Sequence, residues 1–287
     1  MDVLMVGATG RYAHFVLAEL VQRGVAVRAL VRSEKSAQVA LRNGAREVTF
    51  GDLDEPESLA AAVTGMEGVF HIGPAFVEDE ATIGVAMVDA ARRAGVRKFV
   101  YSDVIHPAIT AMDNHAAKLP VEEALYSSDL DFTVLQPAVF MQGIADRNWD
   151  EIVNQGRLSL PYSLSSKLCW VDYREVAEAA AIAMTSDRLS YGTFELCAAG
   201  LFDGNQVAAI ASNVLGRPIK AIEITPNRNM PDLPEGVAQR MKKMIAHYHR
   251  CGLPGGNPLV LRAILRREPH TLTDYFGELH AQETKGA

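Results

Sequence analysis

The sequence predicts an α/β fold in which a mostly parallel, doubly wound sheet carries helices on both faces. Three observations support this prediction. Short apolar runs alternate with segments of helical periodicity over the first half of the chain, the connections between them are short, and a glycine-rich turn follows the first run. Strands that alternate with helices over short connections pair in parallel, and right-handed crossovers place the helices on both faces of the sheet.

The elements of the first half can be assigned in order. Asp2–Val6 is an apolar run that ends at Gly7, as expected for a strand buried on both faces. Apolar residues recur at helical spacing in residues 12–23, and Gly24 is a plausible C-terminal cap. Val25–Val31 is the second predicted strand. Further strands are predicted at residues 47–50, 68–72, 98–101 and 132–135, and further helices at residues 34–43, 56–64, 80–94 and 117–128.

The second half is less regular, and no linker in it is rich enough to separate two independent domains. Helices are predicted at residues 172–184 and 206–215, and strands at residues 192–197 and 219–224. We expect these elements to extend the first sheet and to cover its edge. The predicted division is therefore residues 1–150, the ligand-binding core, and residues 151–287, a mixed region that completes the sheet and forms a small lobe.

Composition excludes several classes of protein. The 287 residues carry a net charge of −7, so a general nucleic-acid or anionic-membrane binder is not expected. The three cysteines (Cys169, Cys197, Cys251) are far apart and form no CxxC pair, which indicates reduced thiols and no zinc site. No apolar run has the length of a membrane span, and the predicted first strand leaves no room for a signal peptide. We expect a cytoplasmic protein with a small-molecule or protein partner; its oligomeric state is left open.

A glycine-rich turn joins the first strand to the first helix. It reads Gly7-Ala8-Thr9-Gly10-Arg11-Tyr12-Ala13. Such a turn brings backbone N–H groups and a helix N-terminus against a pyrophosphate, and glycine permits the close approach. Its position, after a strand and before a helix, is the context that a dinucleotide site requires. The alternative is a glycine turn that binds nothing.

The end of the second strand favours NADP over NAD. An NAD site places an acidic residue about 20 residues after the glycines, to accept from the ribose 2′-hydroxyl. Arg32 stands in that region, and its planar guanidinium suits a 2′-phosphate, with Ser33, Lys35 and Arg11 as further donors. NAD stays possible, because a single arginine also tolerates a bare ribose. The alternative is that Arg32 is a solvated surface charge.

These motifs make a family resemblance visible along nearly the whole chain. The sequence resembles the NmrA-like branch of the atypical short-chain dehydrogenase/reductase superfamily. The matching segments are VGATGRYA (6–13), VRALVRS (27–33), GDLDEPESL (51–59), AGVRKFVYSDVIHP (94–107), NHAAKLPVEEAL (114–125), DFTVLQPAVFMQ (131–142) and TLTDYFGEL (271–279), the last of which looks like the closing helix of the family. The resemblance implies a Rossmann core with a small C-terminal α/β substrate lobe.

The resemblance also implies a set of cofactor-binding residues. It places Gly7, Thr9, Gly10, Arg11 and Tyr12 around the pyrophosphate, Asp52 and Leu53 by the adenine, Gly73 and Pro74 by the ribose, Lys118 by the nicotinamide ribose, and Pro137, Ala138 and Val139 by the nicotinamide ring. Ser102, at the end of the fifth strand, is counted among the cofactor-binding residues as well.

One departure from the superfamily affects the chemistry. The usual pair is a tyrosine followed four residues later by a lysine, but here Asn114 precedes Lys118 at that spacing. Tyr101 is expected to pack in the sheet. Lys118 and His115 are therefore the candidate catalytic residues, with a bound water, or no proton transfer at all, as alternatives. For either His106 or His115, a structural role is the more frequent one for a loop histidine.

Candidate substrate contacts follow the fifth and sixth strands. His106, Phe140, Met141 and Trp149 are assigned to a wall that suits a flat aromatic or quinoid ligand, although core packing explains any one of them equally well. Glu122 and Glu123 are expected to lie on a helix face in water. Neither the carboxylates nor His247 and His249 have metal-ligand spacing, so no metal site is expected.

Three functions are compatible with this sequence. The first is an NAD(P)H-dependent reductase of a quinone, enone or aromatic ketone; quinones fit the missing tyrosine, since charge on a reduced quinone is delocalised. The second is a non-catalytic NAD(P)-sensing regulator. The third is a tailoring enzyme, a reductase or oxygenase, for polycyclic aromatic metabolites.

Overall fold

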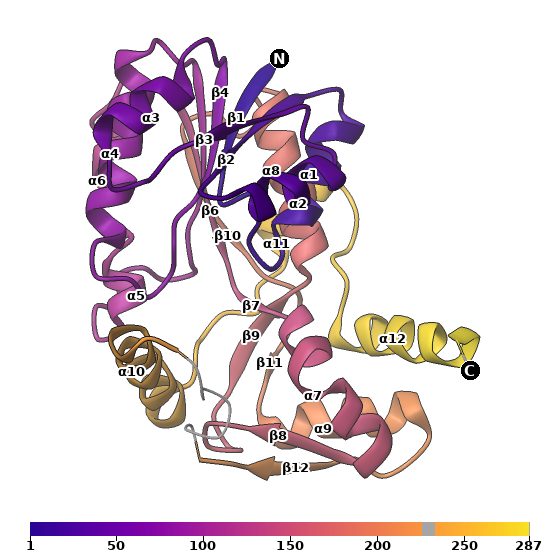
Figure 1. Cartoon of the computed structure of the whole chain (residues 1–287). Helices are drawn as coiled ribbons and strands as arrows, with labels where there is room; N and C mark the ends of the chain where they lie inside the picture. The colour runs from indigo at the N-terminus through magenta and orange to yellow at the C-terminus, as the bar shows by residue number, and fades with distance from the viewer. Residues whose placement is uncertain (226–232, 287) are drawn as a thin grey trace. The chain divides into compact units, whose positions relative to one another are not determined.

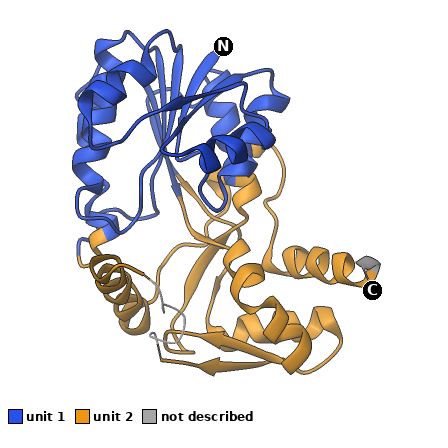
Figure 2. Ribbon diagram, in the orientation of Figure 1, with its two compact units in different colours: residues 1–110, 114–136, 176–194 blue, residues 111–113, 137–175, 195–287 orange. Residues whose placement is uncertain are grey.

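The computed structural model describes residues 1–225 and 233–286 (Figure 1). The chain forms two compact units, which Figure 2 shows in different colours. Unit 1 consists of residues 1–110, 114–136 and 176–194, and unit 2 of residues 111–113, 137–175 and 195–287. The chain therefore enters each unit more than once. The functional division at residue 150 stays a prediction.

Unit 1 is built on a seven-stranded sheet in the order β10-β6-β5-β4-β1-β2-β3. β1 pairs in parallel with both β2 and β4, with Val3 opposite Val27 on one side and Gly68 on the other. The parallel pairing continues through β3, β5 and β6, which confirms the doubly wound sheet. The strands are β1 (Asp2–Val6), β2 (Ala26–Val31), β3 (Glu47–Phe50), β4 (Gly68–Ile72), β5 (Lys98–Ser102), β6 (Asp131–Pro137) and β10 (Gly192–Leu196).

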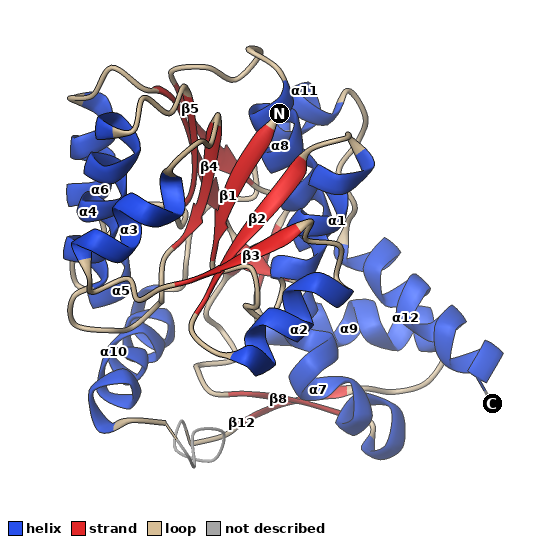
Figure 3. Ribbon diagram, turned by 45° about the horizontal axis from the view of Figure 1, so that its top comes forward, coloured by secondary structure: helices blue, strands red, loops and turns tan. Residues whose placement is uncertain are grey.

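Helices cover both faces of this sheet (Figures 1 and 3). One face carries α3 (Pro56–Val63), α4 (Glu80–Arg93) and α6 (Leu119–Tyr126), and the other carries α1 (Ala13–Gln22), α2 (Glu34–Arg42) and α8 (Tyr173–Thr185). A short helix, α5 (Asp113–Ala116), precedes α6. Under α3, α4 and α6, buried apolar side chains such as Val69, Met87, Phe99 and Val121 form a continuous core. Burial of this apolar surface is the main force that holds the helices to the sheet.

Unit 2 contains two small sheets. One has the order β11-β9-β7, from β7 (Val139–Phe140), β9 (Leu168–Val171) and β11 (Leu201–Phe202); the other pairs β8 (Arg157–Leu160) with β12 (Lys220–Glu223). Its helices are α7 (Gln142–Gln155), α9 (Gly204–Leu215), α10 (Glu235–Cys251), α11 (Leu259–Leu265) and α12 (Leu272–Gly286). The expectation that the later strands extend the first sheet is right for β10 and wrong for β12, which pairs in parallel with β8 instead.

A buried carboxylate joins the helices of unit 2. Asp172 is fully buried, and it accepts hydrogen bonds from Gln142 Nε2 at 2.6 Å and from the backbone N–H of Arg174 at 2.9 Å. The Arg174 guanidinium also pairs with Glu278 at 2.6 Å. α7, the start of α8 and α12 are therefore held by one charged network. Among the described residues, no helix combines the length and apolarity needed to span a membrane.

Candidate functional site

The glycine-rich turn places backbone N–H groups at the carboxyl end of β1. Gly7 has φ +79°, and a Cβ added to it would lie 2.7 Å from the carbonyl oxygen of Ile72, the last residue of β4. The N–H of Gly10 donates to the Gly7 carbonyl at 2.9 Å, which closes the turn. Only glycine fits at position 7, since a side chain there would meet backbone. Thr9, Gly10 and Arg11 lie exposed on this turn.

The end of β2 presents the residues predicted to select NADP. Arg32 and Lys35 are exposed. Ser33 is the N-terminal cap of α2: its Oγ accepts from the N–H of Ser36 at 3.2 Å and donates to the Ser36 hydroxyl at 3.1 Å. The serine hydroxyl is thus engaged in capping. Arg32 is left as the main expected partner of a 2′-phosphate, next to the N-terminus of α2.

The residues after β3 form a tight turn. The N–H of Asp52 donates to Ser58 Oγ at 2.8 Å, and Asp52 Oδ1 accepts from the N–H of Asp54 at 3.2 Å. Leu53 is half-buried against the apolar core under α3 and α4. β2 and β3 are neighbours in the sheet. These contacts therefore fix the backbone beside the end of β2, where Arg32 lies exposed.

The loop after β4 contains Gly73 and Pro74, and a buried histidine precedes it. His71 is fully buried, and neither of its ring nitrogens has a hydrogen-bond partner among the residues that the structure describes. Burial, and after it the positive charge of Lys118, lowers the pKa of His71 to about 3. The ring is therefore neutral, and it stacks on Tyr101 with 5.8 Å between ring centroids. A Cβ added at Gly73 would lie 3.6 Å from His71 Nε2, so the histidine reaches the loop after β4.

Lys118 lies between α5 and α6 and is buried. Its Nζ lies 2.5 Å from Oε1 of Glu80, on the first turn of α4, and 5.6 Å from the centroid of the Tyr101 ring. Glu80 Oε2 also accepts from the N–H of Phe76 at 3.1 Å. Tyr101 packs in the sheet, as predicted. Burial and the nearby carboxylates raise its pKa, which makes its phenol a poor acid in place of the missing tyrosine.

The two candidate histidines contact each other after β5, His106 in the loop and His115 on the short helix α5. His115 is buried, and its Nδ1 lies 3.1 Å from the carbonyl oxygen of His106, so the tautomer with a proton on Nδ1 donates to that carbonyl. His106 has φ +54°, an uncommon conformation for a residue with a side chain. Ser102 ends β5 and is buried. The contact between His115 and His106 supports a structural role for both in unit 1.

Glu122 is not on a solvated face, contrary to the sequence-based expectation. It is buried, whereas its neighbour Glu123 is exposed. Gln136 Nε2, on β6, donates to Glu122 Oε1 at 2.5 Å and lies 3.5 Å from Oδ2 of Asp103. Glu122 shares the buried face of α6 with Val121 and Leu125, and the hydroxyl of Tyr126, four residues further on, donates to Glu122 Oε2 at 3.1 Å.

The remaining candidates, at residues 137–141 and 149, all lie in unit 2. Met141 and Ala138 are buried, and Pro137 and Val139 flank them at the ends of β6 and β7. Phe140 packs edge to face on Tyr173, with 4.6 Å between ring centroids. Trp149 stacks on Phe276 at 6.3 Å. These contacts indicate packing within unit 2 for Phe140, Met141 and Trp149, and a substrate-facing role stays a prediction.

Sequence reasoning missed five members of the buried polar cluster around Lys118: His71, Glu80, Asp103, Glu122 and Gln136. Their positions in the sequence gave only weak signals. His71 is the one polar residue of an otherwise apolar strand, and Gln136 lies in a similar position on β6. Polar residues at the carboxyl ends of parallel strands are found where such sheets bind ligands.

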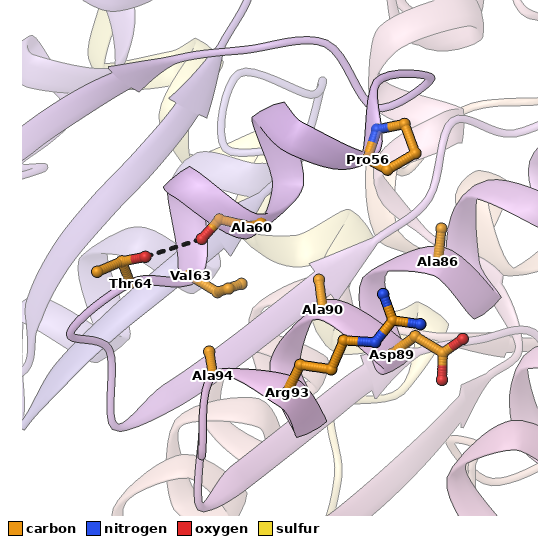
Figure 4. A pocket seen from close by; sticks show the side chains of 9 residues that line it. All are labelled: Pro56, Ala60, Val63, Thr64, Ala86, Asp89, Ala90, Arg93 and Ala94. Atoms are coloured by element: carbon orange, nitrogen blue, oxygen red, sulfur yellow. Dashed lines mark hydrogen bonds between the residues drawn. The ribbon is translucent and has the colours of Figure 1, made fainter.

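Two grooves lie away from these residues. One, of about 420 Å³, lies between α3 and α4 and is lined mainly by small apolar side chains such as Ala60, Ala86 and Ala90, which Figure 4 labels. The other, of about 730 Å³, lies within unit 2 between α10 and the end of β12. None of the predicted site residues lines either groove.

Comparison with known proteins defines the family of this chain. The model of the NmrA-like family matches residues 1–276. The chain therefore belongs to the NmrA-like family, as the sequence motifs predicted. It is 29% identical over 250 residues to the NAD(P)H azoreductase of Xenophilus azovorans, a match that covers 85% of this chain and 86% of that protein.

Solved structures share the fold. The NADPH-dependent quinone oxidoreductase QOR2 of Escherichia coli, complexed with NADPH, superposes with a TM-score of 0.81 at 20% identity and covers 97% of this chain and 99% of its own. NmrA, a negative transcriptional regulator crystallised with NADP, gives a TM-score of 0.79 at 19% identity and covers 99% and 97%. At such identities the likeness establishes the fold.

Proposed function

We propose that this protein is an NADPH-dependent reductase of quinones and related electron-poor conjugated acceptors. The observation that carries the proposal is the arrangement of the candidate loops. The loops after β1, β2, β3 and β4 leave neighbouring strands at the same edge of one parallel sheet, since the order there is β4-β1-β2-β3. Ligands of open α/β sheets bind at the carboxyl ends of the strands, where the strand order reverses.

The residues of this edge fit a dinucleotide phosphate. Gly7 lets the turn pass close to Ile72, where a Cβ would lie 2.7 Å from the carbonyl oxygen, and the turn leads directly into the N-terminus of α1. α1 has no acidic residue in its first turn and no side-chain cap at its N-terminus, so an anion is favoured there. The exposed Arg32 suits a 2′-phosphate. The relative named NAD(P)H azoreductase supports a reductase with a nicotinamide cofactor.

When bound, NADPH supplies a hydride, that is, a hydrogen with its electron pair. The role we propose for Lys118 is to donate to the nicotinamide ribose and so to orient the ring. Glu80 holds the lysine ammonium in place at 2.5 Å. With Asn114 at the position of the usual tyrosine, no phenol stands four residues before Lys118. Quinones suit such a site, because their reduced oxygens delocalise charge and need less help from an acid.

The test is consumption of NADPH and of NADH, followed by the absorbance of the reduced nicotinamide, against a panel of quinones, enones, aromatic ketones and azo dyes. We expect turnover with quinones and with azo dyes, and faster consumption of NADPH than of NADH. Tight nucleotide binding without turnover on any acceptor would contradict the proposal. That result would favour a nucleotide-sensing protein instead, a second candidate that the absence of a phenol before Lys118 also fits.

A further inference from the structure

The cluster beside Lys118 contains more acids than bases. Glu80, Asp103 and Glu122 are buried within it, and so is Lys118. Lys118 pairs with Glu80. Within the described part of the chain, neither Asp103 nor Glu122 forms an ion pair with a basic side chain. A buried carboxylate without a cation is costly, and the usual remedy is to retain a proton.

The hydrogen bonds show where that proton lies. Asp103 and Glu122 meet at the amide of Gln136, whose Nε2 lies 2.5 Å from Glu122 Oε1 and 3.5 Å from Asp103 Oδ2, and two ionised carboxylates so placed would repel each other. Glu122 Oε1 and Oε2 already accept from Gln136 and Tyr126, and Asp103 Oδ1 accepts from the N–H of Val104 at 2.7 Å. Among the described residues, Asp103 Oδ2 has only the long contact to Gln136, so the proton fits best on Asp103. Burial, and after it the interaction with Glu122, raises the pKa of Asp103 to about 9.

The carboxyl pair is connected to the surface. Tyr126 is 50% exposed, and its hydroxyl bonds both Glu122 Oε2 and Thr193 Oγ1, at 3.1 and 2.9 Å. On the other side, the positive charge of Lys118 acts on Asp103. The titratable groups that face the pair are thus Lys118, Glu80 on α4, Tyr101 on β5 and Tyr126 on α6.

We propose that Asp103 and Glu122 share one proton at neutral pH and that this pair is the proton store of the reductase site, refilled from water through Tyr126. The role in turnover rests on the function proposed above. The acceptor is reduced by the hydride of NADPH, which is oxidised to NADP⁺, and the acceptor then takes a proton from the Lys118 ammonium. The O–H bond of Asp103 breaks, its proton restores the ammonium, and a proton from water returns to the pair. The pair thereby acts in place of the missing phenol.

The first test needs no turnover. Infrared spectra of the chain labelled with ¹³C-aspartate would show the stretch of a protonated carboxyl at pH 7. We expect this band in the wild type and in the control variant Glu123→Gln, because Glu123 is the exposed neighbour of Glu122 on α6. We expect its loss in Asp103→Asn, in which an amide replaces the protonated carboxyl. A wild-type spectrum with ionised aspartates only would overturn the shared proton.

The second test measures turnover. Asp103→Asn and Glu122→Gln should bind NADPH as the wild type does and lower kcat by roughly 10²-fold or more, the range of general acid catalysis. The wild-type kcat should fall at high pH, where the pair loses its proton, and this dependence should vanish in Asp103→Asn. Unchanged kcat in both variants would overturn the proton store. If the wild type binds NADPH but reduces no acceptor, the proposed function and the store fail together, while the infrared band still decides whether the proton is shared.

Discussion

Lys118 and Glu80 form a buried ion pair in which the lysine Nζ lies 2.5 Å from a carboxylate oxygen. The side chains are 5% and 1% exposed, so water screens neither charge. Such a pair adds little to stability beyond what an apolar pair would add, but removal of one partner leaves the other as an unpaired buried charge. The residue that the family resemblance assigns to the nicotinamide ribose therefore has a structural partner as well.

We predict that Lys118→Met destabilises the protein by about 3–5 kcal/mol, because Glu80 is left without its cation. The double variant Lys118→Met/Glu80→Gln should recover much of that loss, since neither residue of the pair then carries a charge. Denaturant unfolding measures both. Equal instability of the single and double variants would show that the pair is not responsible.

The double variant also tests the role of Lys118 at the site. If Lys118 holds the ribose, the NADPH dissociation constant of the double variant should be higher than that of Glu80→Gln alone. A loss of kcat of roughly 10²–10⁴-fold is expected if the lysine also transfers the proton. If neither quantity changes, Lys118 is not in the site.

Arg32→Ala should weaken NADPH binding by about 1.5–3 kcal/mol, the range for a charge-assisted hydrogen bond, and leave NADH binding nearly unchanged. Arg42→Ala is the matched control, because Arg42 is exposed at the C-terminal end of α2, the helix that follows Arg32. Calorimetric titration with each nucleotide measures the effect. Equal affinity of the wild type for NADPH and NADH would contradict the assignment of NADP.

Gly7→Ala should abolish nucleotide binding, whereas Gly24→Ala should leave it intact. The two glycines have nearly the same φ, +79° and +76°, so both variants bear a similar backbone strain of about 1–2 kcal/mol. Only at position 7 does the new Cβ meet backbone, since nothing lies within 4 Å of a Cβ at position 24. Loss of nucleotide binding in both variants would mean that strain, and not contact with Ile72, is decisive.

His71 should make the fold sensitive to acid. Burial and the charge of Lys118 lower its pKa from 6.5 to about 3, so the unfolded chain binds a proton on His71 below about pH 6.5 and the folded chain does not. The free energy of unfolding should therefore fall as the pH drops from 6.5 towards 3, by about 1.4 kcal/mol per pH unit for this proton.

His71→Phe should remove that part of the slope and cost little at pH 7, because it also removes two buried nitrogens without partners. His14→Phe, at an exposed histidine, is the control. Urea unfolding at several pH values measures the slope. If His71→Phe keeps the full slope, the acid sensitivity lies elsewhere.

The first half of the fold could be predicted because each strand and helix there has a clear period and a short connection. The strands of unit 2 could not be predicted in the same way. β7 and β11 have two residues each, too few to show a pattern. The sequence of β12 predicts a strand but does not say whether that strand pairs with β8 or with the large sheet. The choice of strand partner is made by packing, which the sequence pattern does not express.

The candidate site was predictable where the chain itself brings residues together, as in the turn from Gly7 to Ala13. The buried cluster was not, because Glu80 comes from α4, Gln136 from β6, and Lys118 and Glu122 from the start of α6. In sequence, Glu122 and Glu123 look alike, and only the angle of α6 against the sheet makes one buried and the other exposed.

The interleaved course of the chain has a consequence for its synthesis. Unit 1 needs residues 176–194, yet the ribosome releases all of residues 137–175 before them. At roughly 5–20 residues per second, the nascent sheet waits several seconds for β10. During that time β6 is an open edge with unpaired backbone groups, the kind of edge that recruits other strands. A chaperone that shields this edge would be more valuable to the growing chain than to the finished protein, and a fragment that stops at residue 150 would keep the edge open permanently.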